Sequence, residues 1–361
     1  MVGTADMDLS DIRIIDAHIH QWDPFGTPRE FSGSARLFRM LPIPLDLAKR
    51  VSPRRDREFV GDPTAYVNQY LPADYRADVA AIPVESIVHI EVGWTGKDRA
   101  EETAWVAGLP FGADNPALGA IIGNADPAAP DFAVLLDAHL AASPLLRGIR
   151  AHVAHHPDPH VRPYTEREGA LTTKEFLNGF AALAERGLSF DAWVYSHALP
   201  DVTALAERYP EVPIVLDHLA TPAGIFGPVG KHTGTNPSLR RELFVRWRDD
   251  LSALAENPHV VAKVSGLMMP VLGHPVPPRG TSTPVPVLLD RIRPLVEHAC
   301  DVFGTDRLLW GSNFPVDKPI TRIADSAEVI ATVITERGDG HRELEQIFRT
   351  NAQRTYRIES L

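Results

Sequence analysis

The chain has 361 residues, with 36 Lys and Arg against 47 Asp and Glu, a net charge of −11 and a single cysteine. The negative charge argues against nucleic acid or an anionic membrane as the main partner, because both attract cationic proteins, and no apolar run reaches the roughly 18 residues that span a bilayer. One cysteine excludes an intrachain disulfide framework, and residues 1–10 lack a basic, apolar leader, which indicates a cytoplasmic protein.

Short apolar or β-branched segments alternate along the chain with helical patterns. Eight segments are predicted to be strands: Ile12–Ala17, Ser86–Glu91, Leu118–Ala125, Leu146–Ala151, Leu188–Tyr195, Ile214–Asp217, Val260–Val264 and Leu308–Trp310. The predicted helices include Asp131–Ala142, Thr173–Arg186 after a Thr172/Glu175 capping box, Asp201–Tyr209, Ser238–Glu256 and Val287–Phe303. Parallel βαβ units with eight strands are typical of a TIM barrel.

We therefore predict an α/β fold, a distorted (β/α)8 TIM barrel that forms one domain over residues 1–361. A doubly wound open sheet is the alternative, but no G-x-G-x-x-G loop follows the first strand. The segments after the predicted strands are long, the longest being an excursion over residues 21–71, and they hold more than half of the 32 prolines. Such loops surround the catalytic face of a barrel, so the site is expected among long, stiff loops.

Polar and aromatic side chains follow the first two predicted strands. His18 and His20 lie two residues apart, so on a strand both imidazoles would face the mouth of the barrel, as a pair of metal ligands requires. Glu91 follows the second strand and is a candidate metal ligand or base, with a salt-bridged rim residue as the alternative. Trp22 and Trp94, near the same strand ends, are candidates for an aromatic wall of the substrate site.

The fourth predicted strand ends with an arginine and is followed by several histidines. Arg150 suits a bidentate grip on a carboxylate or on a polarised carbonyl. His152 and His155 are candidate substrate contacts, whereas His156 and His160 are expected on a solvated loop.

The fifth, sixth and seventh strands supply further candidates. Tyr195 and His197 close the fifth strand and are candidate substrate contacts. His218 directly follows the sixth strand, which favours a metal-binding or catalytic role over a core histidine. Lys263 lies inside an otherwise apolar strand, where a buried ammonium needs an anionic partner or a lowered pKa. The alternative is that its stem turns outward, toward the helices.

The eighth strand is followed by a tight Gly-Ser-Asn turn, which would present Asn313 at the mouth. Asp317 lies four residues further on and is either a helix cap or a candidate base.

The order of these motifs resembles the amidohydrolase superfamily, and more narrowly the amidohydrolase-related TIM-barrel hydrolases that include sugar lactonases, 2-pyrone-4,6-dicarboxylate lactonase and 4-sulfomuconolactone hydrolase. The resemblance runs from Ile14 to Tyr356 and rests on IIDAHIHQWDP, QYLPADY, VHIEVGW, RGIR, FDAWVY, IVLDHLATP, KVSGL, GSNFPVD and NAQRTY. It implies that His18 and His20 ligate a divalent metal or, in metal-free lactonases, touch the substrate. It also implies that His218 is the sixth-strand histidine and that Arg150 binds the substrate.

Two positions depart from the pattern of that family. Asn313 stands where most relatives have an aspartate that ligates a metal or acts as general base, and an asparagine takes no proton at neutral pH. His197 stands where relatives tend to have a glutamine nearby. The base is therefore open among His218, Glu91 and Asp317, with His218 as the first choice.

The leading prediction is a hydrolase of a small, anionic cyclic ester or a similar activated carboxylic derivative. The carbonyl would be polarised by a divalent metal, zinc first, or in a metal-free site by arginine and histidine, while Asn313 would orient the water or hold the oxyanion. The predicted metal ligands are His18, His20, His218 and Glu91. The predicted catalytic residues are His218, Asn313, Arg150, Glu91, Lys263 and Asp317.

Two other functions stay open at this point. A zinc-dependent decarboxylase of an aromatic acid would use the same histidines, and a non-catalytic binding barrel would need none of them. The expected partner is a small molecule, and association into a homo-oligomer is compatible with a barrel of this kind.

Overall fold

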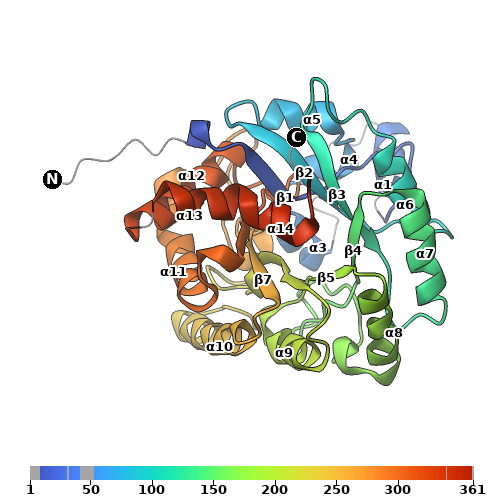
Figure 1. Cartoon of the computed structure of the whole chain (residues 1–361). Coiled ribbons are helices and arrows are strands. Elements are labelled where there is room, and N and C mark those ends of the chain that lie inside the picture. Colours follow the sequence, from blue (N-terminus) through green and yellow to red (C-terminus); the bar gives the residue numbers. More distant parts are fainter. Residues whose placement is uncertain (1–8, 31, 41–52, 339, 360–361) are drawn as a thin grey trace.

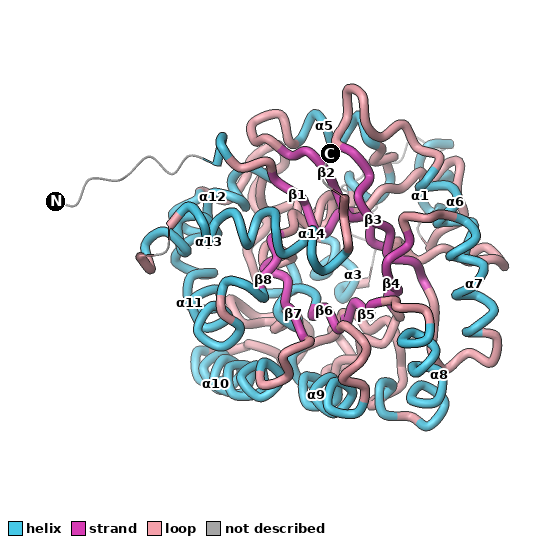
Figure 2. Tube along the Cα trace, viewed as in Figure 1, coloured by secondary structure: helices cyan, strands magenta, loops and turns pink. Residues whose placement is uncertain are grey.

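Eight parallel strands form the centre of the molecule. The computed structural model describes residues 9–30, 32–40, 53–338 and 340–359, and its strands pair in the order β1 to β8. The strands are β1 (Ile14–Ile19), β2 (Val84–Ile90), β3 (Ala117–Asn124), β4 (Leu146–Arg150), β5 (Ser189–Ala192), β6 (Ile214–Leu216), β7 (Val260–Val264) and β8 (Leu308–Trp310). Figure 2 shows them as a ring with helices outside it. All eight predicted strands are confirmed, with small shifts at their ends.

The ring is closed by residues that follow β8. The backbone N–H of Asn313 donates to the carbonyl of His18 over 2.8 Å, and that of His20 donates to the carbonyl of Phe314 over 2.9 Å. Ile19 and Phe314 form the corresponding parallel bridge. The predicted TIM barrel is therefore confirmed, and its closure brings the end of β1 against the turn after β8.

The helices are α1 (Ser32–Met40), α3 (Arg54–Val60), α4 (Thr64–Val67), α5 (Pro72–Asp78), α6 (Ala100–Ala107), α7 (Phe132–Ala142), α8 (Lys174–Glu185), α9 (Leu199–Arg208), α10 (Pro237–Ala255), α11 (Val285–Phe303), α12 (Ile323–Glu336), α13 (His341–Glu345) and α14 (Asn351–Tyr356). Most of the helices lie around the ring of strands, whereas α3 and α14 overlap its centre in the view of Figure 1. Among the described residues, no helix is both long and apolar enough to cross a membrane.

Both faces of each strand are buried, which explains why the strands appear in the sequence as continuous apolar segments. One large buried cluster joins strands to the surrounding helices. A smaller cluster holds Ile15, Val88 and Val215 together with Tyr356 at the end of α14. Burial on both faces is typical of parallel strands.

The excursion predicted after β1 is only partly described, because residues 31 and 41–52 lie outside the described ranges. Its described parts include α1, α3 and α4. The other long segments, which follow β4, β6, β7 and β8, connect strands to helices as expected.

The capping box predicted at the start of α8 is wrong by one residue. The Oγ1 of Thr173, and not that of Thr172, accepts the backbone N–H of Phe176 over 3.3 Å. Thr172 lies in the preceding short 3-10 helix, Ala170–Thr172, which occupies the position expected for the cap.

Replacing Thr173 should therefore destabilise the protein more than replacing its neighbour. We expect Thr173→Ala to cost about 1 kcal/mol, because the first turn of α8 loses its cap. Thr172→Ala is the matched control and should cost less. Urea unfolding followed by circular dichroism measures both, and equal losses would contradict the observed cap.

Candidate functional site

A pocket lies among the loops that follow the strands. Its empty space is about 640 Å³, which includes space open to solvent. Its lining comprises His20, Trp22, Glu30, Phe59, Tyr66, Glu91, Val92, Gly93, Arg150, His152, Tyr164, Trp193, His218, Met269, Asn313 and Val316. Five of the lining residues are Phe, Tyr or Trp, and apart from Glu30 the polar groups lie at or just after the ends of strands, as in other barrels of this type.

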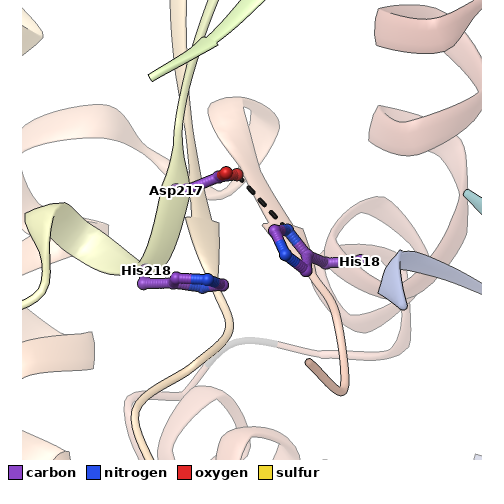
Figure 3. Close-up of side chains that lie close together, drawn as sticks. All are labelled: His18, Asp217 and His218. Carbon is purple, nitrogen blue, oxygen red and sulfur yellow. Dashed lines mark ion pairs between the residues drawn. The ribbon is translucent and has the colours of Figure 1, made fainter. Parts of the chain in front are cut away.

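A cluster of potential metal ligands lies where β1 and β6 end (Figure 3). The carboxylate of Asp217 points toward the ring of His18, with 3.3 Å between Oδ1 and Nδ1. The rings of His18 and His218 lie 4.4 Å apart between centroids. All three residues are buried, and one ligand atom from each lies within 4.8 Å of the others. The Nε2 atom of His18 has no hydrogen-bond partner among the described residues.

This donor set fits a divalent metal. Two imidazole nitrogens and one carboxylate oxygen are the ligands found at zinc sites that keep a position for water. A metal would bind the lone pair of the buried Nε2 of His18, which otherwise has no partner among the described residues. Neither His20 nor Glu91, both predicted as ligands, belongs to the cluster among the described residues.

The backbone that carries His218 is strained. Residues His218, Leu219, Ala220 and Thr221 all have positive φ values of 56°, 47°, 61° and 38°. Such conformations cost about 1–2 kcal/mol each for residues with a Cβ. The indole N–H of Trp247 donates to the carbonyl of Leu219 over 2.8 Å and helps to hold the turn. Strain of this kind is concentrated at functional sites.

The ring of His218 packs against Gly266. Its φ is +61°, and a Cβ there would lie 2.4 Å from Cγ and Nδ1 of His218. The same side of the ring is held by Ser265, whose Oγ lies 2.9 Å from Nδ1. The position of His218 therefore depends on the absence of a side chain at position 266.

A buried ion network lies beneath the cluster. The Nζ of Lys263 lies 2.6 Å from Oδ2 of Asp191 and 3.0 Å from Oδ1 of Asp217, and the hydroxyl of Tyr356 donates to Asp191 over 2.7 Å. Lys263 is fully buried, which confirms that its side chain turns inward and finds anionic partners.

The two aspartates of this network differ in how firmly they hold a proton. Burial raises the pKa of Asp191 to about 6, although Lys263 lowers it in part. Burial also opposes the charge of Asp217, but the Lys263 ammonium and His18 outweigh it and hold the pKa of Asp217 well below its usual range. Asp217 therefore stays ionised at lower pH than Asp191 does.

Glu91 binds Arg150 firmly. The Nε of Arg150 donates to Oε1 of Glu91 over 2.7 Å, and Nη2 donates to its backbone carbonyl over 2.8 Å. His152 lies 3.2 Å from both carboxylate oxygens, and Asn124 donates to Oε2 over 2.6 Å. Burial opposes the charge of Glu91, yet His152 and Arg150 hold its pKa well below the usual range. These contacts occupy the carboxylate and favour a positioning role over the base or ligand role expected from the sequence.

Asn313 and Asp317 lie together at the turn after β8. The Asn313 amide lies 3.3 Å from Nε2 of His20 and 2.8 Å from Oδ1 of Asp317. Burial raises the pKa of Asp317 to about 8. Asn313 lines the pocket, whereas Asp317 lies behind it. The position predicted for Asn313 at the mouth agrees with this arrangement.

The predicted wall residues divide into two groups. Trp22 and His152 line the pocket, and Trp22 stacks on Tyr66 with 5.4 Å between ring centroids. Trp94, His155, Tyr195 and His197 are not among the described residues that line it.

The placement of these residues has a physical reason. The hydroxyl of Tyr195 donates to the carbonyl of Arg162 over 2.7 Å, so its side chain packs into the core beneath the loops. His155 and His197 face each other, with ring centroids 6.5 Å apart. His156, expected to be solvated, is instead buried against Tyr195, while His160 is exposed as predicted.

Several residues of the site were not predicted from the sequence. Asp217 closes a predicted strand and was not itself a candidate, although its place directly before His218 was a usable signal. Asp191 and Asn124 also stand at strand ends. Tyr164 comes from the loop after β4 and Trp193 follows β5, and no periodicity in such segments tells where a side chain points.

Comparisons with known proteins agree with this site and fold. A family model described as Amidohydrolase matches residues 15–358. The uncharacterised protein y4mH of Sinorhizobium fredii is 33% identical over 310 residues, which are 86% of this chain and 87% of that protein. L-fucono-1,5-lactonase of Burkholderia ambifaria is 32% identical over 224 residues, which are 62% of this chain and 65% of the lactonase.

Solved structures share the barrel. The crystal structure of an amidohydrolase from Burkholderia multivorans with bound HEPES is 23% identical, with a TM-score of 0.69 over 96% of this chain and 99% of that chain. A second crystal form of that amidohydrolase contains bound zinc and gives a TM-score of 0.66 at the same identity and coverage.

A methyl group at position 266 should displace His218. We expect Gly266→Ala to destabilise the protein by about 1–3 kcal/mol beyond the cost of its positive φ, because the new Cβ overlaps the imidazole. Gly187→Ala is the matched control: Gly187 has a φ of +59°, and a Cβ added there would meet nothing within 4 Å, so it should cost only about 1–2 kcal/mol. Chemical unfolding compares the two, and equal costs would show that His218 can move aside freely.

Proposed function

The chain belongs to the amidohydrolase family, and we propose that it is a hydrolase that opens a small cyclic ester, a lactone, by attack of water on the ring carbonyl. The observation that carries this proposal is the convergence of His218, Arg150 and Asn313 on one aromatic pocket at the carboxyl ends of the strands. The similarity to L-fucono-1,5-lactonase supports a lactone as the substrate class.

Arg150 is proposed to polarise the carbonyl of the ring. Its two bonds to Glu91 fix the guanidinium before the substrate arrives, so it needs no rearrangement as charge develops on the oxygen. Its third nitrogen, Nη1, makes a longer contact of 3.6 Å to Asp217. Because Glu91 already neutralises the guanidinium, we propose an uncharged ring in place of the anionic one expected from the sequence.

His218 is proposed to accept the proton of the attacking water. Burial lowers the pKa of His218 to about 3, so the imidazole is neutral at physiological pH but a weak base, and it takes a proton only with a nearby anion to stabilise the imidazolium. The ionised carboxylate of Asp217 lies close enough to stabilise the imidazolium that forms. The proton then passes to the ring oxygen as its bond to the carbonyl carbon breaks, and the product is an open hydroxy acid.

Asn313 and the aromatic walls complete the proposed site. An amide N–H of Asn313 would stabilise the negative oxygen of the tetrahedral intermediate. Trp22, Tyr164 and Trp193 line the pocket and would supply apolar surface against a small ring while water is excluded.

The same cluster could also hold a metal. His18, Asp217 and His218 would be its ligands, and a bound zinc would polarise the carbonyl and lower the pKa of a water molecule. As a ligand, His218 would no longer be available as a base. The two assignments for His218 therefore exclude each other.

Removing the imidazole should abolish most of the activity on lactones. We expect His218→Asn to lower kcat about 10²–10⁴-fold, the usual contribution of a general base. The test is a panel of uncharged and anionic lactones, with opening followed by acid release. His341→Asn, an exposed histidine at the start of α13, is the control and should match the unmodified protein. Release of carbon dioxide from aromatic acids without any lactone opening would replace the proposal by a decarboxylase.

Zinc should bind the cluster and slow the reaction. We expect one zinc per chain by elemental analysis after loading, and loss of that zinc in His18→Ala, because one of the three ligands is removed. Added zinc should inhibit lactone opening and chelation should restore it, since the metal occupies the proposed base. Activation by zinc and loss of activity on chelation would show instead that the metal mechanism operates.

A further inference from the structure

The side-chain amide of Asn313 lies between two partners that decide its orientation. Oδ1 of Asn313 lies 3.3 Å from Nε2 of His20, and Nδ2 lies 2.8 Å from Oδ1 of Asp317. The oxygen and nitrogen of an amide have nearly the same shape, so the correct orientation follows from the hydrogen-bonding character of the neighbours.

His20 must accept a hydrogen bond from this amide. Its Nδ1 lies 2.9 Å from the backbone carbonyl of Ile90, and a carbonyl only accepts, so the ring proton sits on Nδ1. His20 is buried, and among the described residues its ring nitrogens contact the Ile90 carbonyl and the Asn313 amide, with no carboxylate paired to the ring. A buried imidazolium would need such a partner, so the ring is neutral and Nε2 carries a lone pair. The group of Asn313 that faces Nε2 is therefore the NH2 end.

The other end of the amide then faces Asp317. With its nitrogen toward His20, Asn313 presents its carbonyl oxygen to Oδ1 of Asp317 across 2.8 Å. Two acceptors cannot share such a contact, so the carboxyl group must supply the hydrogen. The second oxygen of Asp317 accepts the backbone N–H of Met268 over 3.3 Å and needs no proton.

We propose that Asp317 is a positioning residue that acts as a neutral carboxylic acid: its O–H donates to the amide oxygen of Asn313 and so turns the N–H groups of Asn313 toward His20 and the pocket. The proposal rests on the proposed function, because those N–H groups are the donors assigned to the oxyanion. It gives a role to a residue that touches neither the substrate nor the cluster of His18, Asp217 and His218.

The surroundings of Asp317 favour the neutral form. Asp317 is 1% exposed. The groups that act on it from neighbouring elements are the amide of Asn313, the backbone of Met268 and the neutral phenol of Tyr66 from α4, and no cation is among the partners found in the described part of the chain. Burial without a nearby cation raises the pKa of a carboxyl group, here to about 8.

The proposal predicts opposite effects from two substitutions of Asp317. Asp317→Asn keeps a donor toward Asn313, because its own amide N–H replaces the acid O–H, so kcat at pH 7 should stay within about threefold of the unmodified enzyme. Asp317→Leu has a similar volume and no donor, so kcat should fall about 10²-fold, as when one oxyanion donor is lost. The reverse order of activities would overturn the proposal.

The pH profile separates this role from a purely structural one. Above about pH 8, Asp317 loses its proton, the amide of Asn313 turns and kcat of the unmodified enzyme should fall about tenfold per pH unit. Asp317→Asn cannot ionise and should lack this alkaline limb. An identical limb in both proteins would show that the proton is not on Asp317.

Two measurements without substrate keep the test independent of the lactonase proposal. Between about pH 4 and 8 the native protein holds a proton that the unfolded chain releases, so its stability falls as the pH rises. The melting temperature of Asp317→Asn relative to the unmodified protein should therefore increase from pH 5 to 8 and then stay level. A difference that is constant over this range would show that Asp317 is ionised throughout.

Infrared spectroscopy supplies the second measurement. At pH 7 the unmodified protein should show a carboxylic-acid C=O band that disappears in Asp317→Asn. Asp249→Asn, on the exposed face of α10, is the control and should retain the band. If no lactone is opened while the band and the melting profile behave as expected, the lactonase proposal is wrong and the proposal of a protonated Asp317 is supported. Absence of the band would overturn the proposal of a protonated Asp317.

Discussion

Lys263 carries a positive charge into the fully buried centre of the barrel, where Asp191 and Asp217 lie 2.6 and 3.0 Å from its Nζ. A buried charge is tolerated only with close partners of opposite sign, and removing one partner typically costs about 3–5 kcal/mol. These three residues come from β5, the end of β6 and β7, so the network fixes the relative positions of three neighbouring strands. Tyr356 joins it from α14 and ties the end of the described chain to the same charges.

Pairing of opposite charges continues from the centre of the barrel to the pocket. Oδ1 of Asp217 lies close to both Lys263 and His18, at 3.0 and 3.3 Å, and its Oδ2 lies 3.6 Å from Nη1 of Arg150. Arg150 in turn binds Glu91, which follows β2. Each charge is therefore held by a partner from another strand, and the parallel arrangement places all of them at one end of the barrel. The geometry of the site follows from charge pairing between strands more than from the loops above it.

The sequence was sufficient for the parts of the molecule that depend on local pattern. Eight apolar runs indicated the barrel because both faces of each strand are buried, and residues at strand ends, such as Arg150 and His218, lie in the pocket because those ends converge. The capping residue of α8 was misplaced because Glu175 completes the capping-box pattern with Thr172, whereas the neighbouring Thr173 is the residue whose side chain accepts the N–H of Phe176. Tyr195 was expected in the pocket but points beneath the loops, since strand alternation does not extend beyond Ala192. The left-handed turn at His218 has no sequence signal, because residues with a Cβ rarely adopt it.

Asp217 and Asp317 illustrate how one residue type serves two purposes in one site. Both are fully buried, and burial alone favours the protonated form of each. Asp217 has the ammonium of Lys263 at 3.0 Å and stays ionised, whereas Asp317 has an amide and a backbone N–H as its partners and holds its proton. The presence or absence of one cation thus separates a carboxylate that can stabilise positive charge from an acid that can donate a hydrogen bond. With Asn313 at the end of β8, the ionised carboxylates of the site are Asp217 after β6 and Glu91 after β2, and the turn after β8 is left to supply donors.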